Sequence, residues 1–185
     1  METSMTLTFL DTAKVMASVD RMPDEQMAVL LRRLRLFDAK GLVPVHRQDI
    51  GRREGRLDLV GACMARLYSE LLDFGLDAET LRGLRTKLDL NDIDKSQTHL
   101  ATAIDAIRSG GEVTLYVELW QQSDPWKKGL SFRLHGHRAK NTRAANAVKL
   151  HEQMKGLKVR LLLPISLNRL LGDFISAFAA ADTGA

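Results

Sequence analysis

Arginine side chains that could pair with an anion gather in one stretch of the first half of the sequence. Between Arg32 and Arg56 there are eight basic residues and three acidic ones. A guanidinium group can form two parallel hydrogen bonds with phosphate oxygens or with the edge of a guanine. The stretch therefore predicts a DNA contact, made by Arg32, Arg33, Arg35, Arg52, Arg53 and Arg56. The alternative is a solvated helix face, which is what most charged stripes are.

A second basic segment lies between Lys127 and Arg160, where ten basic residues accompany a single acid, Glu152. Its excess of charge predicts a second contact, with DNA phosphate, RNA or an acidic protein. The residues assigned to this second anionic contact are Lys127, Lys128, Arg138, Lys140 and Arg143. A solvated loop and helix flank is the alternative. Trp126 could stack on a base, although pinning a hairpin is the simpler role.

Other side chains that could act in catalysis or bind a metal ion do not form a recognisable pattern. His135 and His137 lie close together and His151 follows, but no carboxylate or thiolate stands at supporting spacing, and neighbouring cations would repel a metal ion. The sequence shows no glycine-rich phosphate loop, no nucleophile elbow and no His-Glu-x-x-His helix. We therefore expect no metal, no cofactor and no enzymatic activity. Cys63 is expected to be a small core residue on the apolar side of a helix.

Two helices joined by a tight turn must position the first arginines. Apolar spacing predicts one helix over residues 9–18 and a second from Pro23 to Lys40, which Gly41 ends. The second helix has one apolar stripe, made of Met27, Leu30, Leu31, Leu34 and Phe37. Its three arginines lie off this stripe, so we expect them to face outward. This order predicts a helix-turn-helix with a basic outer face.

The other arginines of the first half belong to a segment between helices. Residues 42–45 are typical of a strand interrupted by proline, and residues 46–55 predict a short hairpin with a basic tip that contains glycine. A third helix is expected from Leu57 until Gly75 ends it. Asp77 is expected to cap a short fourth helix that closes this unit. The first half is thus predicted to be mostly helical, with the hairpin as a wing.

This order of elements resembles the MerR-type winged helix-turn-helix. The likeness covers about residues 9–88 and rests on two strings, Leu34 to Pro44 and Asp73 to Leu81. The family pattern places an arginine, two aromatic residues and an acid before a glycine and an apolar pair. Later it has a glycine, an apolar residue, two further positions and an acid before a closing helix.

The resemblance assigns roles to two of the arginines of the predicted DNA contact and adds Phe37 to that contact. It implies that Arg35 is the arginine of the recognition helix, Phe37 its second aromatic residue and Arg56 the arginine of the wing. Leu36 and Leu57 stand where the family usually has tyrosine. Phosphate contacts by tyrosine hydroxyls are therefore not carried over to this chain.

The second half has a different pattern of elements. A polar linker is expected at residues 91–95, and residues 112–120 alternate apolar and polar side chains as a strand does. The full pattern predicts helices over 95–108, 142–154 and 166–180, and strands over 112–120, 130–134 and 159–163. These elements predict a small α+β domain with a short antiparallel or mixed sheet. The apolar stripe from Leu167 to Phe178 is expected to cover this sheet as core, and a dimer surface is the alternative.

Length and composition fit one or two small globular domains. The chain has 185 residues, of which 45% are hydrophobic and 27% charged. Its net charge of +4 permits nucleic-acid binding without establishing it. A single cysteine fits a reducing compartment, and the sequence lacks a long apolar run or a signal-peptide pattern. We therefore expect a cytoplasmic protein without membrane association.

Together these observations predict two domains and one main function. Residues 1–90 are predicted to form a MerR-like winged helix-turn-helix DNA-binding domain, and residues 91–185 an α+β domain for regulation, oligomerisation or partner binding. The chain is predicted to be a sequence-specific DNA-binding transcription regulator of a bacterial or phage type. Its expected partners are double-stranded DNA, a second copy in a homodimer, and the transcription machinery. The alternative is an architectural or adaptor protein whose basic second half binds nucleic acid or an acidic protein partner.

Overall fold

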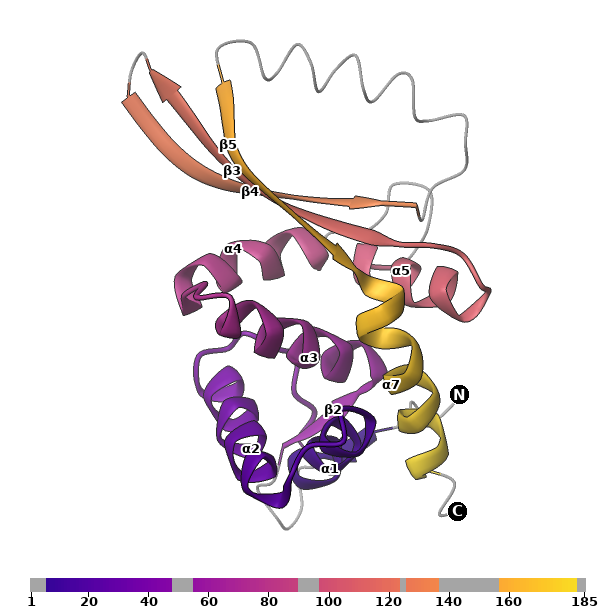
Figure 1. Cartoon of the computed structure of the whole chain (residues 1–185). Coiled ribbons are helices and arrows are strands. Elements are labelled where there is room, and N and C mark those ends of the chain that lie inside the picture. The colour runs from indigo at the N-terminus through magenta and orange to yellow at the C-terminus, as the bar shows by residue number, and fades with distance from the viewer. Residues whose placement is uncertain (1–5, 48–54, 90–96, 124–125, 137–156, 183–185) are drawn as a thin grey trace.

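The chain folds into an α+β structure in which helices form the body and a long sheet lies across one side of it (Figure 1). The computed structural model describes residues 6–47, 55–89, 97–123, 126–136 and 157–182. The elements are β1 Thr6–Thr8, α1 Phe9–Val19, α2 Asp24–Ala39, β2 Arg56–Asp58, α3 Leu59–Asp73, α4 Ala78–Leu88, α5 His99–Arg108, β3 Thr114–Ser123, β4 Trp126–His135, β5 Leu157–Ser166 and α7 Leu167–Asp182. The predicted α+β class and the mostly helical first half are confirmed. The predicted helix over 142–154 lies outside the described residues.

Short polar residues fix where helices begin. At four helix starts a side-chain oxygen accepts the backbone N–H three residues further on, which satisfies one of the donors that the first turn leaves unpaired. The capping residues are Thr8, Asp58, Asp77 and Thr98. The predicted cap at Asp77 is confirmed, and its hydrogen bonds to the backbone and side chain of Thr80 lower the pKa of the Asp77 carboxyl.

One backbone motif ends α1, α2, α3 and α5. In each case the residue two places past the helix cap donates its N–H to a carbonyl in the last turn, and the residue before it adopts a left-handed conformation. Glycine fills that left-handed position after α2, α3 and α5, at Gly41, Gly75 and Gly110. After α1 the position is filled by Arg21, with φ of 51°. The turn between α1 and α2 is therefore made without glycine.

A small antiparallel sheet joins the start of the chain to the segment before α3. β1 pairs with β2, with Leu7 opposite Leu57, and both leucines are buried. The predicted strand over 42–45 is not formed, and a single bridge follows it, between His46 and Arg56. Pro44 has no N–H to donate to a neighbouring strand. The predicted hairpin tip lies outside the described residues.

The larger sheet is antiparallel throughout, with the order β4-β3-β5. This settles the predicted choice between an antiparallel and a mixed sheet. Val113, Leu115 and Val117 are buried on the face of β3 that is turned toward the helices. α4 and α5 lie beneath this sheet (Figure 1). The hairpin of β3 and β4 continues beyond these helices, so part of it projects from the body.

The helix α7 connects the sheet with the first half of the chain. It packs against α1, α3 and α5, and its apolar side chains Leu167, Leu171, Phe174 and Phe178 have no exposed surface. The stripe is core, as expected, but much of what it covers is the N-terminal helices. The alternative of a dimer surface is wrong for this stripe. The predicted boundary near residue 91 lies outside the described residues, while the buried apolar residues on both sides of it form one cluster.

A buried arginine ties three helices together inside this core. Arg66 of α3 is 4% exposed and donates two hydrogen bonds to the carboxylate of Asp20, at 2.7 and 2.5 Å. Its Nε donates to the backbone oxygen of Leu170 at 2.6 Å, and its guanidinium lies 5.4 Å from the centre of the Phe174 ring. The end of α1, the middle of α3 and the first turns of α7 thus meet at one side chain.

Candidate nucleic-acid interface

The outer face of α2 carries two arginines whose charge points to solvent. Leu30, Leu34 and Phe37 are buried, and helical spacing places Arg32 and Arg35 away from them. Both arginines are exposed, and within the described residues neither has an ion-pair or hydrogen-bond partner for its side chain. This agrees with the expected outward orientation and leaves two guanidinium groups available to a ligand.

Arg33 lies between them in sequence but serves a different purpose. Its two terminal nitrogens donate to the two carboxylate oxygens of Asp73 at 2.8 and 2.5 Å, and one of them also donates to the backbone oxygen of Ser69 at 3.3 Å. The hydrogen bonds with Arg33 lower the pKa of the Asp73 carboxyl, and the same bonds raise the pKa of Arg33. The guanidinium therefore fastens α2 to the end of α3 and is not available to DNA in this arrangement.

Phe37 is also removed from the predicted contact set. Its side chain has 0% exposed surface and meets the ring of Tyr68 edge-on, with 6.0 Å between centroids and 84° between planes. From this position it cannot touch a ligand on the surface. Tyr68 is buried as well, and this burial raises the pKa of its hydroxyl, which is therefore neutral.

The start of the predicted wing is fixed to α2. Arg47 donates to both carboxylate oxygens of Asp38, at 2.8 Å each. At the other end of the segment, Arg56 donates to the side chain and the backbone oxygen of Thr6, at 3.0 and 2.7 Å. Arg56 thus anchors β2 to β1, and its predicted contact with DNA would require leaving this site. The predicted tip residues Arg52 and Arg53 lie outside the described residues.

The second basic segment is described only in part. Lys127 and Lys128 lie on β4 near its turn with β3, opposite Gln122 and Gln121. This end of the hairpin is the part that projects beyond the helices (Figure 1). The other residues of the predicted second anionic contact, Arg138, Lys140 and Arg143, lie outside the described residues.

The described residues hold no cluster of three or more His, Cys, Asp or Glu side chains that could bind a metal ion. His135 closes β4 and its ring meets that of Tyr116 edge-on, while His137 and His151 lie outside the described residues. Cys63 is fully buried, as predicted, and burial raises the pKa of its thiol. A thiol held neutral in the core is a poor nucleophile and a poor metal ligand.

Two tethering arginines were missed by sequence reasoning. Arg47 belongs to the basic stretch, but nothing in the spacing indicates that Asp38 is its partner. Arg85 of α4 pairs with Asp89 at 2.9 Å and also donates to the carbonyl of Gly41, which joins α4 to the end of α2. The pairing with Asp89 could have been found from its spacing of four residues.

Comparison with protein-family models and with curated proteins found no match for this sequence. Within the described residues, no helix combines the length and the apolar character that crossing a membrane requires. The geometry of α2 and its neighbours is therefore what any functional assignment has to rest on.

Proposed function

We propose that the chain is a sequence-specific DNA-binding transcription regulator that reads double-stranded DNA with the outer face of α2. The proposal rests on the different surroundings of the three arginines of α2. Arg33 is bound to α3, whereas Arg32 and Arg35 are exposed and unpaired within the described residues. A helix that is fixed to its neighbour α3 and presents two exposed arginines on its outer face is suited to entering the major groove of DNA.

Leu36 adds an apolar element to the same face. Its side chain is 43% exposed, and helical spacing places it beside Arg32, on the side away from Arg35. The methyl group of thymine is the apolar feature of the major groove, and aliphatic side chains contact it. In the proposed complex Leu36 meets a thymine, while the two arginines pair with phosphates or a guanine.

The segment between Arg47 and Arg56 serves as the wing in this proposal. The ion pair of Arg47 with Asp38 keeps the start of the segment beside α2, and the bridge between His46 and Arg56 brings its two ends together. Arg52 and Arg53, between these ends, are proposed to hold the DNA backbone next to the groove that α2 enters. Replacing both by alanine is expected to flatten the salt dependence of DNA binding.

Selection of DNA from a random pool by the full-length chain tests the proposal. We expect the selected duplex to bind at least about a thousandfold more tightly than a scrambled duplex of the same composition, measured over a range of salt concentrations. A symmetric site would also support the proposed homodimer. Equal affinity for selected and scrambled duplexes would rule out a sequence-specific reader.

The second candidate is an architectural or adaptor protein that uses its second half. It is favoured by the projecting end of the hairpin of β3 and β4, because the strand register puts Lys127 and Lys128 next to the turn at this end. Such a protein binds through phosphate contacts and loses affinity with salt in the same way on every sequence. Replacing both lysines by glutamine would then abolish most binding, whereas a reader that uses α2 would keep its preference for the selected site.

A further inference from the structure

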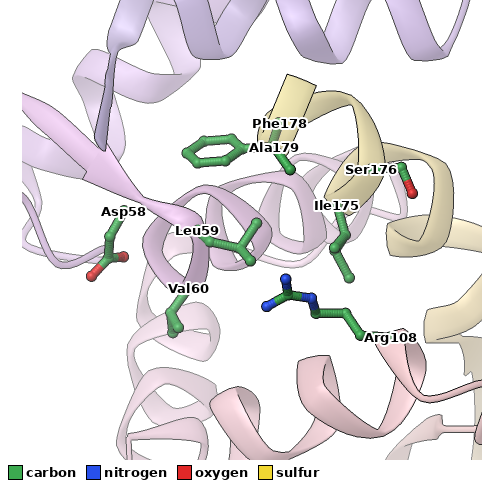
Figure 2. A pocket seen from close by; sticks show the side chains of 8 residues that line it. All are labelled: Asp58, Leu59, Val60, Arg108, Ile175, Ser176, Phe178 and Ala179. Atoms are coloured by element: carbon green, nitrogen blue, oxygen red, sulfur yellow. The ribbon is translucent and has the colours of Figure 1, made fainter. Parts of the chain in front are cut away.

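A cavity of about 480 Å³ opens where the start of α3, the end of α5 and the second half of α7 come together. Its walls are mostly apolar, and Figure 2 shows the side chains of Leu59, Val60, Ile175, Phe178 and Ala179 around it. This volume is in the range of pockets that bind small molecules. The cavity is separate from the outer face of α2 and plays no part in the proposed DNA contact.

One cationic side chain reaches into this apolar surrounding. Arg108, an exposed residue in the last turn of α5, extends toward Leu59 and Ile175, so that its guanidinium group lies beside apolar side chains of the cavity (Figure 2). Within the described residues this guanidinium has no ion-pair or hydrogen-bond partner. It would satisfy its donors in a two-point pairing with a carboxylate.

The other polar side chains that line the cavity are already engaged. Asp58 accepts a hydrogen bond from the backbone N–H of Gly61 at 2.7 Å through one oxygen and contacts Nε2 of His46 at 3.0 Å through the other. The hydroxyl of Ser176 donates to the backbone oxygen of Gly172 at 3.3 Å, within its own helix. Arg108 is therefore the lining side chain whose hydrogen-bond donors are left for a ligand, whereas both oxygens of the Asp58 carboxylate are already in use.

We propose that this cavity binds a small apolar monocarboxylate, with the hydrocarbon part against Leu59, Val60 and Ile175 and the carboxylate on Arg108. A single negative charge matches the single unpaired guanidinium, and the apolar walls exclude water from the rest of the ligand. A neutral molecule of the same shape would lack the ion pair with Arg108 and leave its donors to water, and an amine would be repelled by it.

Calorimetric titration of the full-length chain with octanoate, octan-1-ol and octylammonium tests the proposal without using DNA. The three probes share one hydrocarbon chain and differ in charge. We expect octanoate to bind about tenfold or more tightly than either of the others, because a hydrogen bond to a charged group has that effect. Absence of detectable octanoate binding at about 1 mM, or equal affinity for the three probes, would overturn the proposal.

Two variants test whether the carboxylate of the ligand binds to Arg108. Arg108→Gln is expected to weaken octanoate binding about tenfold and to leave octan-1-ol binding unchanged. Arg169→Gln is the matched control, because Arg169 of α7 is also exposed and unpaired within the described residues and does not line the cavity. Unchanged octanoate binding by Arg108→Gln would overturn the assignment, as would an equal loss in both variants. If Arg108→Gln binds octanoate unchanged, the remaining role of Arg108 is its favourable interaction with the dipole at the C-terminal end of α5.

Discussion

Position on a helix decides whether an arginine of this molecule faces solvent or joins two elements. Arg32 and Arg35 are at positions i and i+3 of the helix and lie on the outer side of α2. Arg33 points toward α3, where Asp73 binds it. The proposed DNA reader therefore depends on two arginines for contact and on the third for holding the helix still.

Replacing Arg32 and Arg35 by alanine should weaken DNA binding by removing phosphate contacts. Each lost contact is expected to lower the slope of log affinity against log salt by about 1. The slope is measured by fluorescence anisotropy at several salt concentrations. Arg169→Ala is the matched control, because it removes an exposed arginine from α7. A slope that is the same in the double variant and the wild type would contradict contact through α2.

The buried ion pair of Arg66 and Asp20 should respond unequally to loss of either partner. Asp20→Ala leaves the Arg66 guanidinium, 5% exposed in its side chain, without a counter-charge and should lower the free energy of unfolding by about 3 kcal/mol. Arg66→Met should cost less, because the Asp20 side chain is 26% exposed and can be hydrated. Urea unfolding measures both values. Equal losses would show that Arg66 gains little from the charge of Asp20.

The contact of Arg33 with Asp73 should make stability depend on pH. The pKa of Asp73 in the folded chain lies below its ordinary value of 3.8, so the ionised carboxylate stabilises the fold. This stabilisation is fully present above the ordinary value and is lost as pH falls through the lowered pKa. Because both side chains are partly exposed, its size should be below about 1 kcal/mol.

Urea unfolding of the wild type and Asp73→Asn from neutral to acidic pH checks this dependence. The wild type should be the more stable at neutral pH, and the difference should shrink below the ordinary pKa of 3.8. Asp24→Asn is the control, because Asp24 is an exposed carboxylate with no ion pair among the described residues. A difference that does not change with pH would show that the Arg33 contact does not act through the charge of Asp73.

At the scale of elements, the ends of helices are the most strongly specified features. Three of the four ends built on the left-handed motif use glycine, and Arg21 after α1 is the exception. A residue with a side chain pays a steric cost in this conformation that glycine does not. The turn between α1 and α2 therefore contains a strained position that the other ends avoid.

Arg21→Gly should raise the free energy of unfolding by up to about 1 kcal/mol, which for a chain of this size raises the melting temperature by about 2–4 °C. Gly41→Ala is the matched opposite change, because Gly41 has φ of 60° and no atom within 4 Å of an added Cβ. It should lower stability by about 1 kcal/mol or more through backbone strain alone. Thermal unfolding followed by circular dichroism measures both. A less stable Arg21→Gly variant would mean that the Arg21 side chain makes a compensating contact.

Sequence patterns predicted the helices and the long strands because these elements carry repeated signals. α1, α2 and α3 begin and end within two residues of the predicted positions, and glycine follows α2 and α3 as expected. β1 was missed because Thr6–Thr8 is too short to show an alternation. The partners of Arg33 and Arg66 were not predictable either, since Asp73 and Asp20 are far away in the sequence and their pairing depends on how the helices pack.

At the scale of the whole molecule, the first half does not bury all of its apolar surface by itself. α7 covers parts of α1 and α3, and Arg66 needs the backbone oxygen of Leu170. A fragment of residues 1–90 should therefore lose cooperative unfolding in urea, although it contains every residue of the proposed DNA contact. The full-length chain is the control. A fragment with cooperative unfolding would support the predicted division into two independent domains.

The packing of α7 on α1 also has a consequence for synthesis. α1 ends at Val19, but its covering helix starts at Leu167, so the ribosome must add most of the chain before the two can meet. At about 5–20 residues per second, the apolar face of α1 waits on the order of ten seconds or more for this partner. During that interval the apolar face of α1 stays exposed on the nascent chain. Chaperones that bind apolar segments can bind it there.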